Sequence, residues 1–311
     1  MPSVTSPEPA PAPPPPQRAV PSPRADSPPP AKASLAESVF DSAAGAPVRW
    51  VAGLGDQVRF YVRAVALTPV ALKRYPKEVV RLLAEVSFGS GALAVIGGTI
   101  GVMVAMSLFT GTVVGLQGYA ALDQIGTSSL NGFISAYFNT REIAPLVAAL
   151  ALAATVGSGF TAQLGSMRIS EEIDALDAMG VATVPYLVTC RMIAGFVAVI
   201  PLYIVGLLTS YAGSRLVTVV FKGQSEGTFD HYFELFLPPI DILLSFVKVL
   251  AFALLIILIH CYYGFTARGG PAGVGVAVGT AVRRSIVTVA LIDFFLSLAL
   301  WGATTTVRIA G

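Results

Sequence analysis

Residues 242–267 read ILLSFVKVLAFALLIILIHCYYGFTA, and Lys248 is their only charged residue. About 20 apolar residues are enough for a helix to cross the hydrocarbon core of a bilayer. Four further stretches have the same character: 88–114, 143–165, 187–214 with Arg191, and 285–307 with Asp293. These stretches predict an all-α integral membrane protein with about five transmembrane helices.

The composition of the whole chain favours the same class of protein. Its 311 residues are 54% hydrophobic and 12% charged, with a mean hydropathy of +0.73, whereas soluble domains carry roughly 25% charged residues. The net charge of +2 provides no basic surface for nucleic acid. The two cysteines, Cys190 and Cys261, lie in apolar stretches and are too few for a disulfide scaffold or a zinc site. Soluble enzymes, disordered proteins and nucleic-acid binders are therefore excluded.

The residues before the first span divide into two parts. Residues 1–46 are rich in Pro, Ala and Ser and predict a disordered cytoplasmic tail, either a docking segment or a solvated extension. Residues 47–86 predict interfacial helices. In the first, 49–67, one apolar stripe lies opposite Arg59, Arg63 and Asp56, which suits a membrane surface; packing on protein is the alternative. The stripe consists of Trp50, Leu54, Val58, Tyr61 and Val65.

Residues 87–311 form the predicted transmembrane domain. Within it, residues 116–140 are half apolar and rich in glycine, so a re-entrant or interfacial helix pair is an alternative to a sixth span. Arginine and lysine are concentrated before residue 87. By the positive-inside rule this bias places the N-terminus in the cytoplasm and, with five spans, the C-terminus outside.

A short acidic segment, 168–180, lies between two spans on the predicted cytoplasmic side. Its helical periodicity places Ile169, Ile173, Leu176 and Gly180 on one face, away from the acidic residues. Such a helix suits docking into a groove of a soluble partner, with the apolar face as anchor. The alternative is a solvated helix on the membrane surface.

Several runs of sequence resemble the YrbE/MlaE family of permeases. They are GLQGY (115–119), REIAPLVAALALAA (141–154), TAQLGSMRISEEIDALDAMGVATVPYLVTCR (161–191), FDHYFELFLPPID (229–241) and ARGGPAGVGVAVGTAVRRS (267–285). The resemblance extends over roughly 74–305, and the last two runs are most similar to the actinobacterial B-type YrbE subunit. These permeases are membrane subunits of ABC lipid transporters that work with Mce substrate-binding proteins.

The resemblance implies a division of labour among several chains. A sister YrbE-type permease would form a heterodimer with this chain around a lipid cavity, and an Mce protein hexamer would carry lipid outside the inner membrane. ABC ATPase subunits would supply energy, with ATP and magnesium bound there and no cofactor in this chain. In the family, the short cytoplasmic helix is the coupling helix that contacts the ATPase. Carried over to this sequence, its residues are Ile169, Glu171, Glu172, Ile173, Asp174, Leu176, Asp177, Met179 and Gly180.

The resemblance also indicates residues near the lipid. Arg141 and Glu142 correspond to a charged sequence near the family's cavity, so they are candidates for contact with a polar head group; a charge pair at a helix start is the alternative. Tyr119 is a candidate at the cavity rim. Other family members carry an arginine near the position of Thr155, and any contact by that arginine cannot be transferred.

The remaining features of the sequence add little chemistry. The chain has no GxxxxGK[ST] loop, so it is not expected to bind ATP phosphates or to be an enzyme. His231 and His260 are isolated, and no metal site is predicted. Gly97-x-x-x-Gly101 and Gly275-x-x-x-Gly279 predict close helix packing, within the chain or at a dimer seam. A stand-alone channel or secondary carrier and a membrane scaffold remain the alternatives to a permease subunit. The identity of the lipid and the direction of transport are not predicted.

Overall fold

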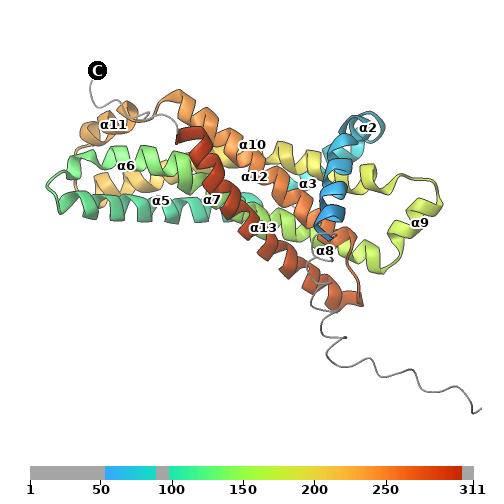
Figure 1. Cartoon of the computed structure of the whole chain (residues 1–311). Helices are drawn as coiled ribbons and strands as arrows, with labels where there is room; N and C mark the ends of the chain where they lie inside the picture. Colours follow the sequence, from blue (N-terminus) through green and yellow to red (C-terminus); the bar gives the residue numbers. More distant parts are fainter. Residues whose placement is uncertain (1–52, 89–97, 303–311) are drawn as a thin grey trace, which may run out of the picture. The chain divides into compact units, whose positions relative to one another are not determined.

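The computed structural model describes residues 53–88 and 98–302, and in these residues all regular structure is helical (Figure 1). The predicted tail 1–46 lies outside the described residues. Residues 53–66 form a first helix. The other helices are α2 (Thr68–Arg74), α3 (Pro76–Phe88), α5 (Thr99–Asp123), η1 (Ser128–Leu130), α6 (Asn131–Phe138), η2 (Asn139–Ile143), α7 (Ala144–Leu152), η3 (Ala153–Gly157), α8 (Ser158–Ile169), α9 (Glu172–Ala178), η4 (Val184–Thr189), α10 (Cys190–Arg215), η5 (Leu216–Phe221), α11 (Glu226–Leu235), α12 (Pro239–Phe265) and α13 (Gly270–Trp301).

Five helical segments in the described residues are long and apolar enough to cross a membrane, which confirms the predicted class. They are Thr99–Asp123, Ser128–Ile169, Val184–Phe221, Pro239–Phe265 and Gly270–Trp301. In Ser128–Ile169 the π-helical turns η2 and η3 join successive α-helices, whereas in Val184–Phe221 the π-helical turns η4 and η5 lie at the two ends of α10. Successive segments run in opposite directions, so α9 lies at one end of the bundle and α11 at the other (Figure 1). We call these the α9 end and the α11 end.

Two helices extend beyond the apolar stretches used to predict the spans. Residues 116–140 are not a re-entrant pair, because α5 continues to Asp123 and the next helical segment begins at Ser128 after a turn. Gly126 makes this turn with a φ of 71°, which favours glycine. The helix that contains the last predicted span begins at Gly270. Arg283 and Arg284 interrupt the apolar pattern but not the helix, because exposed charged side chains leave the backbone hydrogen bonds intact.

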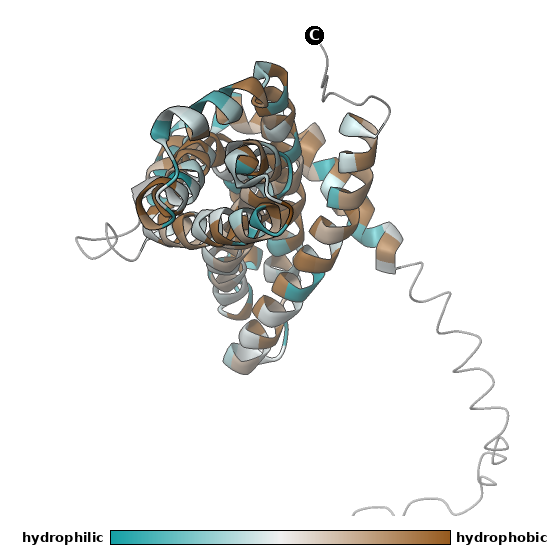
Figure 2. Ribbon diagram, turned by 90° about the vertical axis from the view of Figure 1, so that its left-hand side faces the viewer, coloured by the Kyte–Doolittle hydropathy of each residue, from teal (hydrophilic) through white to brown (hydrophobic). Residues whose placement is uncertain are grey.

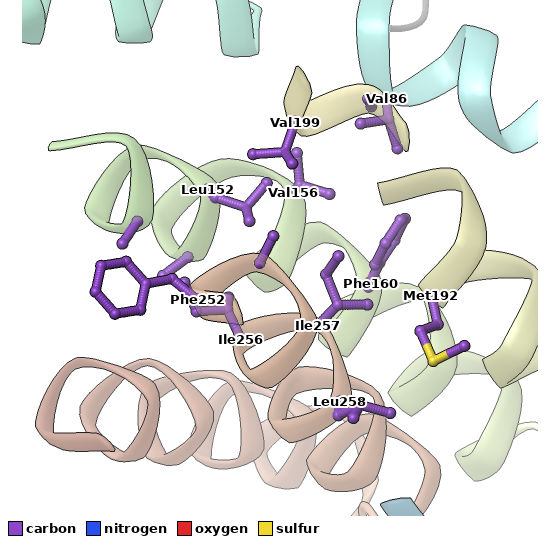
Figure 3. Packing of buried hydrophobic residues seen from close by; sticks show 14 of the residues in the cluster. Val86, Leu152, Val156, Phe160, Met192, Val199, Phe252, Ile256, Ile257 and Leu258 are labelled. Atoms are coloured by element: carbon purple, nitrogen blue, oxygen red, sulfur yellow. The ribbon is translucent and has the colours of Figure 1, made fainter. Parts of the chain in front are cut away.

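The spans pack through a shared apolar core and through glycines. Figure 3 shows Leu152, Val156, Phe252, Ile256 and other side chains filling the space between neighbouring helices. A Cβ atom added at Gly111 of α5 would lie 2.1 Å from the carbonyl oxygen of Ser210 in α10, so these helices approach more closely than any larger residue would allow. Hydrophobic residues, brown in Figure 2, make up much of the bundle, including outward-facing turns of its helices.

Of the two glycine pairs singled out in the sequence, Gly275 and Gly279 do not take part in this packing. A Cβ added at Gly275 would meet nothing within 4 Å, and one at Gly279 would meet only the side chain of Arg283. Packing of this pair within the chain is therefore not observed. Gly97 lies outside the described residues.

The first helix, 53–66, rests on protein through a face that includes only part of the predicted stripe. Phe60 contacts the rings of Tyr262 and Phe265 at the α9 end of α12, with centroid distances of 5.4 and 5.7 Å. Ala64 is fully buried, whereas Val58 is 56% exposed. Of the predicted stripe, Tyr61 packs on the core with Phe60, whereas Val58 and Val65 face outward; their contact with a membrane surface stays a prediction.

Candidate functional site

Five ionisable side chains from three helices meet inside the bundle. Arg141 and Glu142 lie on η2, Asp241 and Lys248 on α12, and Asp293 on α13. We call these five residues the charge cluster. Glu142 is 14 positions after Ser128, about 20 Å along its segment at 1.5 Å per residue, whereas Asp241 lies in the first turn of α12. Charges within a membrane span cost several kcal/mol unless they face protein or water.

Arg141 and Asp241 form one half of the cluster. The Nε and Nη2 groups of Arg141 donate to Oδ2 of Asp241 at 2.9 and 2.6 Å, and both side chains are almost fully buried. The guanidinium lies 4.1 Å from the ring centroid of Tyr137 and 5.3 Å from that of Trp301. Trp301 Nε1 donates to Oδ1 of Asp241 at 2.9 Å. The charge of the Asp241 carboxylate is thus neutralised by Arg141, and the carboxylate accepts hydrogen bonds from two residues, Arg141 and Trp301.

Lys248 is the centre of the other half, and its side chain is fully buried. Its Nζ donates to Oε2 of Glu142 at 2.9 Å, to the carbonyl of Arg141 at 2.8 Å and to Oγ of Ser297 at 2.7 Å. Oδ1 of Asp293 lies 2.7 Å from the same nitrogen. The Ser297 hydroxyl donates to Oε1 of Glu142 at 2.8 Å. One ammonium therefore ties α12 to η2 and to α13.

The structure changes the interpretation of Arg141 and Glu142. They do not open a helix, because they lie on the π-helical turn η2 inside the 42-residue segment Ser128–Ile169. They also do not pair with each other: Arg141 binds Asp241 and Glu142 binds Lys248. π-helical turns inside α-helices occur frequently at functional sites. The Glu142 side chain is 34% exposed, so it is the member of the cluster most open to a ligand or a partner chain.

Sequence reasoning did not assign Asp241, Ser297 and Trp301 to this site. The sequence shows Lys248 and Asp293 as single charges in apolar stretches, and the structure pairs them at 2.7 Å. The signal was the presence of a single charge in each apolar stretch. Asp241 gave no such signal, because it lies at the start of α12 beside prolines, where an acidic residue is ordinary.

Tyr119 lies elsewhere, near the C-terminal end of α5. Nζ of Lys222 lies 5.4 Å from its ring centroid, and neither residue contacts the charge cluster. At the same end, Arg215 pairs with Asp230 and Glu226 at 3.0 and 3.3 Å. The Arg215 guanidinium holds the pKa of the Asp230 carboxyl below its usual range. The structure does not bring Tyr119 together with Arg141 and Glu142.

The predicted coupling helix is shorter than 168–180. The helix α8 ends at Ile169 and α9 covers only Glu172–Ala178, because Glu171 adopts a left-handed conformation with φ 60°. The turn between them is bridged by an ion pair of 2.6 Å between Arg168 and Asp174. The segment is therefore a helical elbow at the end of α8 rather than one continuous helix.

The apolar face of this elbow is turned toward its own chain. Ile173 is fully buried in the core, and Leu176 packs against the same cluster. The interpretation of Ile173 as an anchor for a partner is therefore wrong. The outward face carries Glu171, Glu172, Asp177 and Gly180, together with Met179, which is 69% exposed.

Other polar residues in the spans have structural partners. His260 is fully buried; its Nδ1 lies 2.8 Å from Oγ1 of Thr161 and its Nε2 3.4 Å from Oγ of Ser285. Arg191 does not reach the surface, since it donates to the carbonyl of Leu187 and to Gln163. Among the described residues, no group of three His, Cys, Asp or Glu side chains could hold a metal ion.

Comparisons with known proteins place the chain in a family. Residues 88–299 match the family described as Permease MlaE. A probable ABC transporter permease protein of Rickettsia bellii is 30% identical over 196 residues, which are 63% of this chain and 76% of the relative. The intermembrane phospholipid transport system permease protein MlaE of Haemophilus influenzae is 30% identical over 203 residues, 65% and 78% of the two chains. The chloroplast protein TRIGALACTOSYLDIACYLGLYCEROL 1 of Arabidopsis thaliana is 31% identical over 199 residues, 64% and 57%.

The matched region contains the five apolar helices, the elbow at α9 and the whole charge cluster. The relatives named ABC transporter permeases match at similar identity along comparable lengths. These likenesses agree with a multi-pass inner-membrane protein. The chain belongs to the MlaE family of ABC transporter permeases.

Proposed function

We propose that this chain is the lipid-moving permease subunit of an Mce-type ABC transporter, driven by a separate ATPase that binds at α9. The observation that carries the proposal is the elbow after α8. It presents an exposed acidic face, with Met179, at the end of the helical segment that also carries Arg141 and Glu142. A movement imposed at α9 is thereby connected through one helical segment to the charge cluster.

The sequence supports a division of labour with other chains. No phosphate-binding loop of the GxxxxGK[ST] type occurs in it, so the energy is assigned to an ATPase subunit. The relative from Haemophilus influenzae is named for intermembrane phospholipid transport, which supports a lipid as the cargo. A sister YrbE-type permease and Mce proteins complete the proposed assembly.

We place α9 and the N-terminus in the cytoplasm and the α11 end outside. The distribution of Lys and Arg supports this orientation, since ten of these residues precede residue 87. An ATPase can reach α9 only from the cytoplasm, so the orientation and the coupling role are linked.

Co-purification tests the coupling role. A tagged chain carrying Glu171→Lys and Asp177→Lys should lose its ATPase, because both carboxylates are exposed on the outward face of the elbow. Asp174 is left unchanged, since it pairs with Arg168. The matched control is Glu234→Lys, an exposed acidic residue on α11, which should retain the ATPase. An ATPase that stays bound to the doubly reversed chain contradicts the proposal.

A further inference from the structure

The charge cluster contains more carboxyl groups than cations among the described residues. Arg141 and Lys248 face Glu142, Asp241 and Asp293. The charge of Asp241 is compensated, because its carboxylate receives two hydrogen bonds from Arg141 and one from Trp301. Glu142 and Asp293 are then left with a single ammonium between them.

The carboxyl groups of Glu142 and Asp293 contact the same ammonium group of Lys248. Glu142 Oε2 and Asp293 Oδ1 lie 2.9 and 2.7 Å from the same Nζ atom, so the two carboxyl groups lie close to each other. The ammonium has three protons, and its nitrogen also bonds the Arg141 carbonyl and Ser297. Two carboxylates that share a site cannot both ionise easily, because like charges repel at short range.

We propose that Glu142 and Asp293 bind one proton between them, so that the half of the cluster around Lys248 is electrically neutral. A neutral arrangement suits a position between membrane-spanning helices, where an unbalanced charge is costly. The proton would lie on one carboxyl oxygen and be donated to the other carboxyl group, as in a carboxyl pair with coupled titration. The ligand of this site is thus a proton, and its two acceptors come from η2 and α13.

Within 53–88 and 98–302, the elements that surround this pair bring no other charge to it. From η2 comes Arg141, which is engaged by Asp241; from α12 come Asp241 and Lys248 themselves. The phenol of Tyr137 lies against Arg141, that of Tyr211 bonds Thr140, and that of Tyr203 packs on Phe246. Phenols are neutral at neutral pH. The helix α7, which also packs on α12, carries no titratable side chain.

Proton binding would link the packing of α13 to pH. The closed cluster retains the proton, whereas separation of α13 from η2 admits water, which solvates both carboxylates and allows release. Since the closed form then binds more protons than the open form, rising pH favours the open form. Each opening of the contact between α13 and η2 would therefore release a proton from this site.

Infrared spectroscopy tests the proposal directly. The permease complex is purified through a tag on this chain, placed in lipid nanodiscs and measured at neutral pH in H2O and in D2O. The wild-type complex should show the C=O stretch of a protonated carboxyl group, shifted in D2O and lost as pH rises. Glu142→Gln and Asp293→Asn should each abolish this band, since one carboxylate then remains for one ammonium. Glu234→Gln, which removes an exposed carboxylate on α11, should leave it unchanged.

Each result decides the question. A wild-type spectrum without a protonated carboxyl band overturns the proposal, as does a band that survives both Glu142→Gln and Asp293→Asn. Should a variant fail to assemble, the pH titration of the wild-type band and the remaining variant still decide. The measurement needs neither ATP nor added lipid, so its failure would leave the proposed transport function standing.

Discussion

At the residue scale, the charge cluster shows how ionised groups are tolerated in an apolar bundle. Asp241 is nearly fully buried and receives three hydrogen bonds, two from Arg141 and one from Trp301. Buried ion pairs are only weakly favourable against apolar replacements, but removing one partner leaves an uncompensated charge. The cluster therefore constrains the relative positions of η2, α12 and α13 even if its net contribution to stability is small.

Asp241→Asn tests this constraint. The substitution leaves Arg141 buried without its carboxylate, so it should lower the free energy of unfolding by about 3–5 kcal/mol, seen as a lower unfolding temperature in detergent. Asp230→Asn is the matched control, because Asp230 forms a more exposed pair with Arg215 and should change stability by less than about 1 kcal/mol. Equal effects of the two substitutions would show that burial of the Arg141 pair is energetically unimportant.

The close packing of α5 on α10 also depends on a single residue, a glycine. Gly111→Ala should be destabilising by about 1–3 kcal/mol, because the added Cβ would meet the backbone of Ser210 at 2.1 Å and α5 would have to move away from α10. Gly275→Ala meets nothing within 4 Å and should be neutral or slightly stabilising, since alanine favours helix. Thermal unfolding of the two variants measures the difference; destabilisation by Gly275→Ala instead would indicate a partner on that face.

At the element scale, the elbow at α9 divides its residues into two groups with different tasks. Ile173 and Leu176 pack onto the core, while Met179 and the acidic residues lie outside. Helical periodicity identified the apolar face correctly but could not say what covers it, because an apolar stripe can face either its own chain or a partner. The turn at Glu171, with its positive φ, was not predictable from residue type, since glutamate rarely adopts this conformation.

Substitutions on the two faces of the elbow should have different effects. Ile173→Asp should destabilise the permease itself, because it places a charge in the core. Met179→Asp should leave the thermal stability unchanged, since Met179 is 69% exposed. It should weaken the binding of the ATPase, so that less ATPase co-purifies with the permease. Normal ATPase retention by Met179→Asp, or unfolding caused by it, would contradict the assignment of the outward face.

At the scale of the whole molecule, hydropathy was sufficient for the number and order of the spans but not for their ends. Helices continue past the apolar stretches wherever backbone hydrogen bonds can continue, as at Arg283 and at residues 116–123. The candidate site was only half predictable. Lys248 and Asp293 were visible as isolated charges, whereas the contact of Arg141 with Asp241 joins residues one hundred positions apart, and such a pairing depends on tertiary packing rather than on any local pattern.

The two cysteines provide a test of how the molecule unfolds. Both are fully buried, so neither should react with a maleimide dye in the native protein, whereas a cysteine introduced at exposed Met179 should react. Cys190 is covered by α2 and α3 in a small cluster with Ala71, Val79 and Leu82, while Cys261 lies in the main core of the bundle.

Because short helices with few buried contacts open at lower free energy than the core, α2 and α3 should detach before the spans separate. Cys190 should therefore become reactive at a lower temperature than Cys261. The variants Cys261→Ser and Cys190→Ser each leave one thiol to be measured during heating. Reaction of both thiols at one temperature would show instead that the N-terminal helices and the bundle unfold as a single cooperative unit.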